Sequence, residues 1–315
     1  MAAAEESEWR GHTAHTRLTS AAEAERVVEP VQPEPAPAPP PEPRRGPGRN
    51  LPMAIATGLV LLGMVVGSLI LNPLAFVAVL AVIVLAALVE LLTVLRERGF
   101  KPAEPVVYLV AAIVVLGAWR AGTAALSLGI LVALLAAFGW YLLDRNRAQV
   151  TRNVAITVFA CVYVPFTAAH LVLVVRETPH YVWAVISYGL LVSCYDTFAY
   201  AVGSTLGRRL LAPNVSPSKS VEGAVGATIA TLAFGAFLLP LAAPWTLASG
   251  LTMAVVTCII GPIGDLAESM LKRDLAVKDM GFLMPGHGGF LDRIDALLLV
   301  APALYYVLAL YGGGR

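Results

Sequence analysis

The chain has 315 residues, of which 58% are hydrophobic and 14% are charged, and its formal net charge is +1. Its mean hydropathy of +0.75 excludes a soluble globular domain, because a single core could not bury so much apolar surface. The positive charges are spread through short loops and form no basic stripe, which excludes a nucleic-acid-binding surface. The composition therefore predicts an integral membrane protein.

The first 50 residues differ in kind from the rest of the chain. They pass into the proline-rich run EPVQPEPAPAPPPEPRRGPGR, and they lack the early hydrophobic region that marks a signal peptide. Such a composition cannot bury enough apolar area to fold. We predict that residues 1–50 are a disordered tail, either a solvated extension or a tether for another molecule, in front of a membrane domain at residues 51–315.

The membrane domain contains a series of apolar stretches long enough to cross a bilayer, since a spanning helix needs about 20 apolar residues. These stretches lie near residues 51–72, 74–95, 104–120, 122–143, 153–175, 181–204, 222–243, 245–264 and 296–311. We therefore predict an all-α, polytopic membrane protein with about nine transmembrane helices.

The positions of Arg and Lys predict the orientation of these spans. Every basic cluster either precedes the first span or follows an even-numbered one: Arg44, Arg45 and Arg49; Arg96, Arg98 and Lys101; Arg145, Arg147 and Arg152; Arg208, Arg209 and Lys219; Lys272, Arg273, Lys278 and Arg293. Short loops rich in Arg and Lys stay in the cytoplasm. We expect a multi-pass protein of the cell membrane with its N-terminus and the loops 205–221 and 265–295 in the cytoplasm, and its C-terminus outside.

Lysine is rare and unevenly placed in this chain. Besides Lys101, the only lysines are Lys219, Lys272 and Lys278, which all lie in the two long cytoplasmic loops. A lysine kept in a chain that otherwise uses arginine suggests a compact ammonium group for binding phosphate. The alternative is that positive charge simply gathers in polar loops.

Asp196 lies inside an apolar span, in the run YVWAVISYGLLVSCYDTFAY. A carboxylate at membrane depth costs roughly 2.5–3.5 kcal/mol on insertion, so it needs compensation. Counted along the helix, Asp196 falls in the cytoplasmic half of the bilayer, facing the polar loops. We interpret it as a functional residue; the alternative is a carboxylate hydrogen-bonded to a neighbouring helix.

The end of the eighth span reads GPIGDLAESMLKRD and carries charges at helical spacing. Asp265, Glu268 and Lys272 fall at i, i+3 and i+7, on one helix face. Asp292 and Asp295 repeat the i, i+3 spacing at the start of the ninth span. Such carboxylates can hold a hard cation beside positive groups that bind phosphate, whereas a solvated, salt-bridged helix end is the simpler interpretation.

Between these helices lies the motif PGHGG at residues 285–289. Its glycines allow the backbone to approach a ligand closely and to adopt positive φ, as a phosphate-binding or metal-flanking loop requires. His287 within the motif either donates to a phosphate oxygen or bonds the backbone.

These residues carry a family resemblance. The run SMLKRDLAVKDMGFLMPGHGGFLDRID, residues 269–295, resembles the signature of the phosphatidate cytidylyltransferase family, also called CDP-diacylglycerol synthase. The run SPSKSVEG, residues 216–223, is similar to the family's Ser-Pro-x-Lys-Thr/Ser-x-Glu-Gly element, and the best match covers residues 190–296. Two positions depart from the pattern: Ser218 stands where the family often has a lysine, and Ala296 where a serine is common.

The resemblance implies that CTP and phosphatidic acid react to give CDP-diacylglycerol and pyrophosphate. It implies catalytic roles for Asp265, Asp292, Lys272, Arg273, Lys278, Asp279 and Arg293. It implies substrate-binding roles for Ser216, Lys219, Ser220, Glu222, His287, Asp196 and Asp295. The metal ligands for Mg²⁺ are expected to be Asp265, Asp292 and Glu268. A second, monovalent cation such as K⁺, contact with membrane lipids and a homodimer are further expectations from the family.

Three other functions compete with this interpretation. A related CTP-dependent enzyme would act on another lipid phosphate or on an isoprenoid alcohol. An ion-coupled transporter could use Asp196 and Asp265 as an ion site, but it would be expected to show symmetric half-repeats, and the sequence shows no such symmetry. A CDP-alcohol phosphotransferase would carry an Asp-Gly-x-x-Ala-Arg core, which is absent from this sequence.

Overall fold

The structure of the chain, a computed structural model, describes residues 51–143, 149–242, 244–281, 283 and 288–312. The predicted tail and His287 lie outside the described residues. The helices and strands are, in chain order, α1 Leu51–Leu71, α2 Pro73–Glu97, α3 Glu104–Ala121, α4 Thr123–Leu143, α5 Val150–Cys161, η1 Val162–Phe166, α6 Thr167–Glu177, α7 Tyr181–Leu206, β1 Leu210–Ala212, β2 Ser216–Ser220, α8 Val221–Ala233, η2 Phe234–Leu238, η3 Pro240–Ala242, α9 Leu247–Asp274 and α10 Leu291–Gly312.

The prediction of an all-α, polytopic membrane protein is confirmed. Within the described residues, eight helical segments are long and apolar enough to cross a membrane, judged by length and composition. Two of these segments are continuous runs of several elements: Val150–Glu177 joins α5, η1 and α6, and Val221–Leu238 joins α8 and η2. The first predicted span corresponds to α1, whose apolar part, Ala56–Leu71, is shorter than the other eight.

Several helix ends follow from local sequence signals. At the start of α2 the side chain of Asn72 accepts a hydrogen bond from the Ala75 amide at 2.8 Å, and Pro73 occupies the first helical position, where its missing N–H costs nothing. At the start of α9, Thr246 and Ser249 form a reciprocal capping box. These caps place the helix starts close to the predicted span boundaries.

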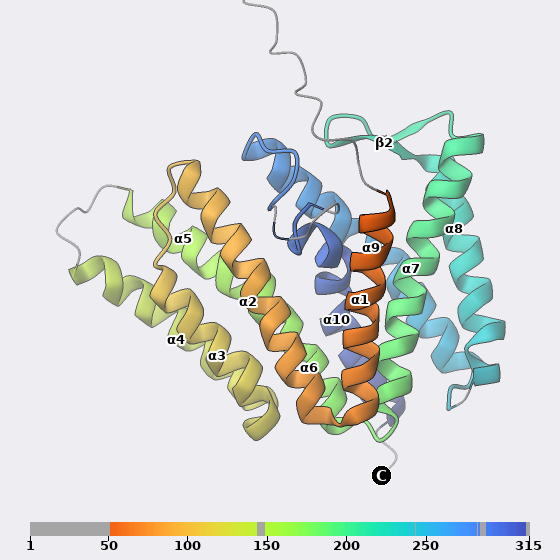
Figure 1. Ribbon diagram of the computed structural model, residues 1–315, viewed down its shortest axis with the longest axis horizontal. Coiled ribbons are helices and arrows are strands. Elements are labelled where there is room, and N and C mark those ends of the chain that lie inside the picture. The colour runs from red at the N-terminus through yellow and green to blue at the C-terminus, as the bar shows by residue number, and fades with distance from the viewer. Residues whose placement is uncertain (1–50, 144–148, 243, 282, 284–287, 313–315) are drawn as a thin grey trace, which may run out of the picture. The chain divides into compact units, whose positions relative to one another are not determined.

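The helices pack as antiparallel neighbours around a core of Leu, Val and Ala side chains (Figure 1). Helices α9 and α10 lie close together where α9 carries Gly264: a Cβ atom placed there would lie 2.9 Å from the Ala296 Cα atom. Because no side chain separates the two backbones at this point, the charged residues of α9 and α10 are brought together.

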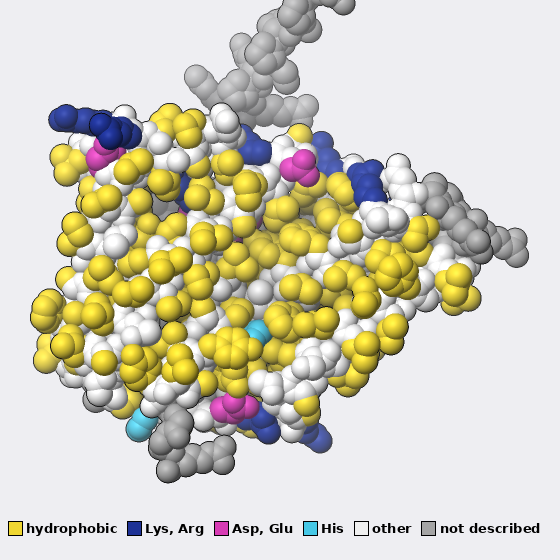
Figure 2. Space-filling model, turned by 180° about the vertical axis from the view of Figure 1, so that it is seen from behind, with side chains coloured by type: hydrophobic (Ala, Val, Ile, Leu, Met, Phe, Trp, Pro, Cys, Tyr) yellow, Lys and Arg dark blue, Asp and Glu magenta, His cyan; other side chains and the backbone are white. Residues whose placement is uncertain are grey.

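The surface agrees with a membrane protein. Figure 2 shows a broad hydrophobic face, with charged side chains gathered along two opposite edges. Large apolar side chains are widely exposed on the helices, including Leu71, Leu143 and Leu310 at 77%, 86% and 81%. Such exposure is unfavourable in water and is expected for side chains that face lipid.

One feature of the fold was not predicted. Strands β1 and β2 form a short antiparallel hairpin between α7 and α8, with Leu210 opposite Ser220 and Ala212 opposite Ser216. Helix α8 then begins directly after β2, where the Ser220 side chain accepts a hydrogen bond from the Gly223 amide at 3.1 Å. The hairpin carries Lys219 toward α9.

Candidate active site

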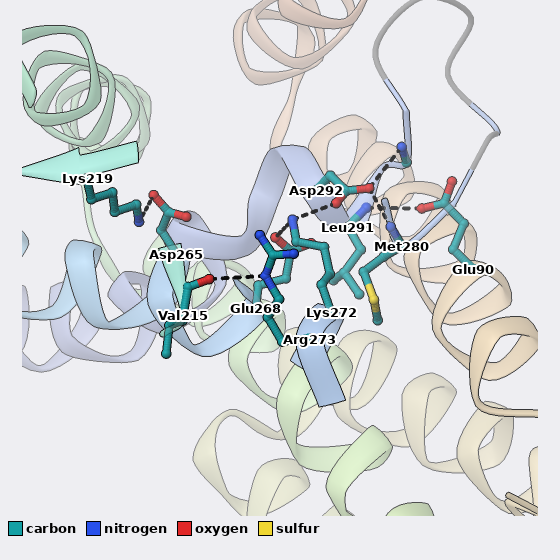
Figure 3. A network of polar contacts seen from close by, with 11 residues as sticks. Glu90, Val215, Lys219, Asp265, Glu268, Lys272, Arg273, Met280, Leu291 and Asp292 are labelled. Carbon is teal, nitrogen blue, oxygen red and sulfur yellow. Dashed lines mark hydrogen bonds and ion pairs between the residues drawn. The ribbon is translucent and has the colours of Figure 1, made fainter. Parts of the chain in front are cut away.

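Lys272 is the centre of the charged cluster, on the last turns of α9. Its Nζ atom lies 2.6 Å from Glu268 Oε2, one helical turn earlier, and 2.9 Å from Asp292 Oδ1 at the start of α10 (Figure 3). The Glu268 and Asp292 side chains are only 1% and 5% exposed. Buried carboxylates need such a partner, because leaving them unpaired is costly. The ammonium group therefore joins α9 to α10 at this end.

A second ion pair brings the hairpin to the same region. Lys219 on β2 pairs with Asp265 on α9, one turn before Glu268 (Figure 3). Farther along α9, Arg273 Nε donates a hydrogen bond to the Val215 carbonyl at 3.3 Å. The two loops predicted to lie in the cytoplasm are thus in direct contact, and their basic residues face the carboxylates of α9.

A small polar cavity lies between the hairpin and α9. It has a volume of about 160 Å³, and its lining includes the hydroxyl groups and cationic side chains of Ser216, Ser218, Ser269, Lys272, Arg273 and Lys278. Hydroxyls and cations that converge on one small cavity are suited to phosphate oxygens.

Glu268 is the most deeply buried acidic residue in the part of the chain that the structure describes. Its Oε1 atom finds no hydrogen-bond donor among the described residues, although the Asp295 carboxylate lies close enough to interact with it. Two ionised carboxylates repel each other and cannot donate to each other, so a shared proton or a cation between them would stabilise this arrangement. Asp265 and Asp196 extend the acidic group, since their charges also act on Asp295 and on each other.

Asp292 is held from two sides at the start of α10. Its Oδ2 atom accepts hydrogen bonds from the Met280 amide at 2.8 Å and from the Gly289 amide at 3.1 Å, while Oδ1 faces Lys272. A carboxylate oxygen has about two acceptor sites, so Oδ1 can accept from a second group besides Lys272. The position in the first turn of a helix also favours a negative charge.

Sequence analysis missed Glu90, which lies on α2 and is only 3% exposed. Its Oε1 atom accepts from the Leu283 amide at 3.2 Å. Its Oε2 atom accepts from the Leu291 amide at 3.1 Å (Figure 3). The signal was present in the sequence, because Glu90 interrupts the apolar run LAALVELLTVL just as Asp196 interrupts its own span.

The remaining predicted residues lie at different distances from this centre. Glu222 accepts from the Arg208 and Arg209 amides at 2.9 and 3.1 Å, so it orders the chain between α7 and β1. Ser220 caps α8. Asp279 lies against Gly288, whose φ of +84° is in the left-handed region that glycine favours.

A larger cavity, of about 550 Å³, opens among α1, α2, α6, α7 and α10. Its lining is mostly aliphatic, but it also includes Asp196, Arg293 and Asp295. Arg293 and Asp295 belong to the first turns of α10, whereas the lining residue Ala301 lies farther along that helix. The polar groups of this cavity are therefore on the side of the charged cluster.

Comparisons with known proteins agree with this geometry. A family model described as "Cytidylyltransferase family" matches residues 52–311. The phosphatidate cytidylyltransferase of Mycobacterium leprae is 33% identical over 283 residues, which cover 84% of this chain and 89% of that protein. The enzyme of the same name from Thermotoga maritima is 36% identical over 179 residues, covering 54% of this chain and 64% of that protein.

A shorter match has a higher identity. The phosphatidate cytidylyltransferase of Bacillus subtilis is 44% identical over 117 residues, which are 37% of this chain and 44% of that protein. The resemblance predicted from the motifs is thereby confirmed. Since the family model spans nearly all of the membrane domain and a relative at 33% identity matches over most of both chains, the chain belongs to the cytidylyltransferase family.

Proposed function

We propose that the chain transfers the cytidylyl group of CTP to phosphatidic acid, giving CDP-diacylglycerol and pyrophosphate. The observation that carries this proposal is the placement of a polar, cationic cavity and a large apolar cavity on the two sides of one buried charged cluster. A water-soluble nucleotide and a lipid need different environments, and these two environments must meet at one reaction centre.

The nucleotide phosphates fit the small cavity. Lys272, Arg273 and Lys278 supply positive charge there, and Ser216 and Ser218 supply hydroxyls. These groups would neutralise the triphosphate, which must otherwise repel a second anionic reactant. Ser218 takes the place of a lysine common in the family, so this chain relies on the three basic residues of the α9 side.

The lipid fits the large cavity. Its aliphatic walls can hold acyl chains, and Arg293 can pair with the phosphate headgroup near Asp292 and the cluster. In the reaction, an oxygen of the lipid phosphate attacks the α-phosphorus of CTP. A new P–O–P linkage forms, the bond from the α-phosphorus to the bridging oxygen breaks, and pyrophosphate leaves with the electron pair. This in-line displacement needs no covalent enzyme intermediate.

The donor set suits Mg²⁺. Glu268 Oε1 is buried near Asp295 with no donor among the described residues, and Asp292 Oδ1 faces Lys272 beside it. Among the described residues no three His, Cys, Asp or Glu side chains form a complete metal-binding group. Mg²⁺ usually takes one or two protein carboxylates and completes its shell with water and substrate phosphates, so one or two of the carboxylates named here would be enough to hold it. When bound, Mg²⁺ supplies charge stabilisation for the nucleotide and the leaving pyrophosphate.

In this proposal the residues around the metal position the reactants. Lys219 and Lys272 hold Asp265 and Asp292 in place by ion pairs and can turn toward phosphate oxygens when substrate enters, because lysine is a flexible point charge. A monovalent second cation, such as K⁺, and a homodimer remain predictions from the family resemblance.

The orientation in the cell membrane is also part of the proposal. CTP is found in the cytoplasm, and the basic residues of the loops 205–221 and 265–295 favour that side. In a background lacking Cys161, Cys194 and Cys258, the variant Ser218→Cys should react with an impermeant thiol reagent from the cytoplasmic side alone. Reaction from outside would overturn the orientation.

The activity is tested with purified protein and α-labelled CTP. Label should enter chloroform-soluble lipid when phosphatidate and Mg²⁺ are present and should stay in the aqueous phase when phosphatidate is omitted. Incorporation with an isoprenoid alcohol or another lipid phosphate, but not with phosphatidate, would mean that this other compound is the lipid substrate. No incorporation with any lipid would contradict the proposed function.

A further inference from the structure

We propose that Glu90 is a positioning residue for the transfer reaction: from α2 it clamps the connection between α9 and α10 and so fixes Asp292. The inference rests on the proposed function, because it assigns Glu90 to the same site. Glu90 does not touch the small polar cavity and is not among the residues lining the large one.

The contacts of Glu90 are made to the backbone of a distant part of the chain. Its two carboxylate oxygens accept from the amides of Leu283 and Leu291, which are 193 and 201 residues away in the sequence. Buried amides without a partner cost about 1–3 kcal/mol each. The carboxylate therefore satisfies two backbone groups and, in return, receives two hydrogen bonds in a buried position.

Two glycines make this approach possible. A Cβ atom on Gly289 would lie 2.6 Å from Glu90 Oε2, and one on Gly281 would collide with the Glu90 carboxyl group. Real Cβ atoms do not come so close to backbone-anchored groups, and a buried carboxylate held by two amides cannot easily move aside. Glu90 thus explains the glycine at position 281, whereas a Cβ atom at position 289 would also lie 2.8 Å from Asp292 Oδ2 and 2.8 Å from the Gly281 nitrogen.

The clamp is interlocked with Asp292. The amides of Met280 and Gly289 donate to Asp292. The amides of Leu283 and Leu291, which alternate with them along the chain, donate to Glu90. The same short connection is therefore held by one carboxylate from α2 and one from α10. If the Glu90 contacts are lost, the amides that hold Asp292 Oδ2 are no longer fixed relative to the helices, and Asp292 loses its orientation.

A glutamine cannot replace this carboxylate. Both oxygens of Glu90 act as acceptors, whereas a side-chain amide offers one acceptor and one donor. In Glu90→Gln, the NH₂ group would face a backbone N–H at Leu283 or at Leu291. Glu90→Asp keeps the charge but shortens the side chain by one methylene, so it cannot reach both amides as before. Glu97, exposed on the same helix, offers the matched control Glu97→Gln.

The first measurement is hydrogen–deuterium exchange of the full-length protein in detergent, on peptides that contain Leu283 and Leu291. We expect exchange of one of these two amides, the one left facing the NH₂ group, to accelerate at least about tenfold in Glu90→Gln, because a buried amide loses its acceptor. Exchange of both amides should stay unchanged in Glu97→Gln. Unchanged exchange in Glu90→Gln would overturn the clamp. If that variant does not elute as a folded protein, Glu90→Asp decides by the same criterion.

The second measurement is a Mg²⁺ titration of cytidylyl transfer. Loss of a group that orients a metal ligand typically costs about 10–100-fold in metal affinity or activity, so the Mg²⁺ midpoint of Glu90→Gln should rise at least about tenfold, and high Mg²⁺ should restore part of its turnover. A purely structural defect would lower turnover without moving the midpoint. An unchanged midpoint together with accelerated exchange would overturn the positioning role.

A double variant tests the explanation of Gly281. Gly281→Ala should lower the turnover of the otherwise wild-type protein. In the Glu90→Ala background the same change should lower turnover by less than about a further twofold, because the colliding carboxylate is gone. Fully multiplicative effects would contradict the proposed contact. If the wild-type protein makes no labelled lipid, the proposed function fails, whereas the exchange measurement still decides whether Glu90 holds the connection.

Discussion

Two ion pairs of similar length lie in very different surroundings. Arg96 Nη1 lies 3.1 Å from Glu104 Oε1 between the end of α2 and the start of α3, with side chains 60% and 32% exposed. Lys272 Nζ lies 2.9 Å from Asp292 Oδ1 between α9 and α10, with side chains 20% and 5% exposed. Both pairs join consecutive long helices. Exposure, and not distance, separates a surface contact from a site.

The physical reason is the cost of removing charge from water. An exposed pair is already solvated, so its net contribution is about 0–1 kcal/mol. A buried carboxylate repays its desolvation only while its partners remain, so losing one partner costs about 3–5 kcal/mol. The α9–α10 cluster contains several buried acidic groups that depend on their partners in this way. Such an arrangement is more characteristic of a functional site than of stability alone.

The largest effect is expected from Lys272→Met. This change removes the ammonium group shared by Glu268 and Asp292 and leaves two buried carboxylates without their cation, which should destabilise the folded protein by about 3–5 kcal/mol. The thermal unfolding midpoint in detergent measures it. Lys272→Arg, which keeps the charge, is the control and should recover much of the stability. An unchanged midpoint for Lys272→Met would mean that the cluster is solvated like the surface pair.

A loss of turnover is expected from Asp265→Asn and Asp292→Asn. Each change removes a negative charge at nearly constant volume, and preorganised electrostatic groups are typically worth about 2.7–4 kcal/mol, so turnover should fall at least about a hundredfold. Gel filtration checks that the variants remain folded. Glu268→Gln should cost less if Glu268 only orients the other groups. Near-normal turnover of both Asn variants would move the site toward Asp196 or Asp279.

The smallest effect is expected from Glu104→Gln, which breaks the exposed pair. Its stability change should stay within about 1 kcal/mol, and its rate of cytidylyl transfer should match the wild-type rate. Unfolding midpoints and initial rates measured beside the Lys272 variants make the comparison direct. A loss of turnover comparable to that of Asp292→Asn would show that exposure does not distinguish the two pairs.

Much of the fold could be predicted from the sequence, because apolar length alone defines a membrane span. The span predicted at 181–204 corresponds to α7, and the span predicted at 74–95 corresponds to α2. Hydropathy could not reveal that α9 continues to Asp274 or that α10 already begins at Leu291, because the charged turns at these ends contribute no apolar signal.

The site could be predicted only where its partners are close in sequence. The helical spacing of Glu268 and Lys272 predicted a shared face, and the structure shows their ion pair. The pairing of Lys219 with Asp265 depends on the β1–β2 hairpin, whose short strands carry no clear alternation of apolar residues. Glu90 has partners almost 200 residues away, and no local pattern indicates such a contact.

The central claim is that the α9–α10 carboxylates support Mg²⁺-dependent transfer from CTP to phosphatidate. The most direct test is a Mg²⁺ titration of CDP-diacylglycerol formation by the wild-type protein and by Asp292→Asn, at saturating CTP and phosphatidate. We predict an absolute requirement for Mg²⁺ in the wild type, with both a higher midpoint and at least about a hundredfold lower maximal turnover in the variant. Superimposable titration curves for the two proteins would contradict the account.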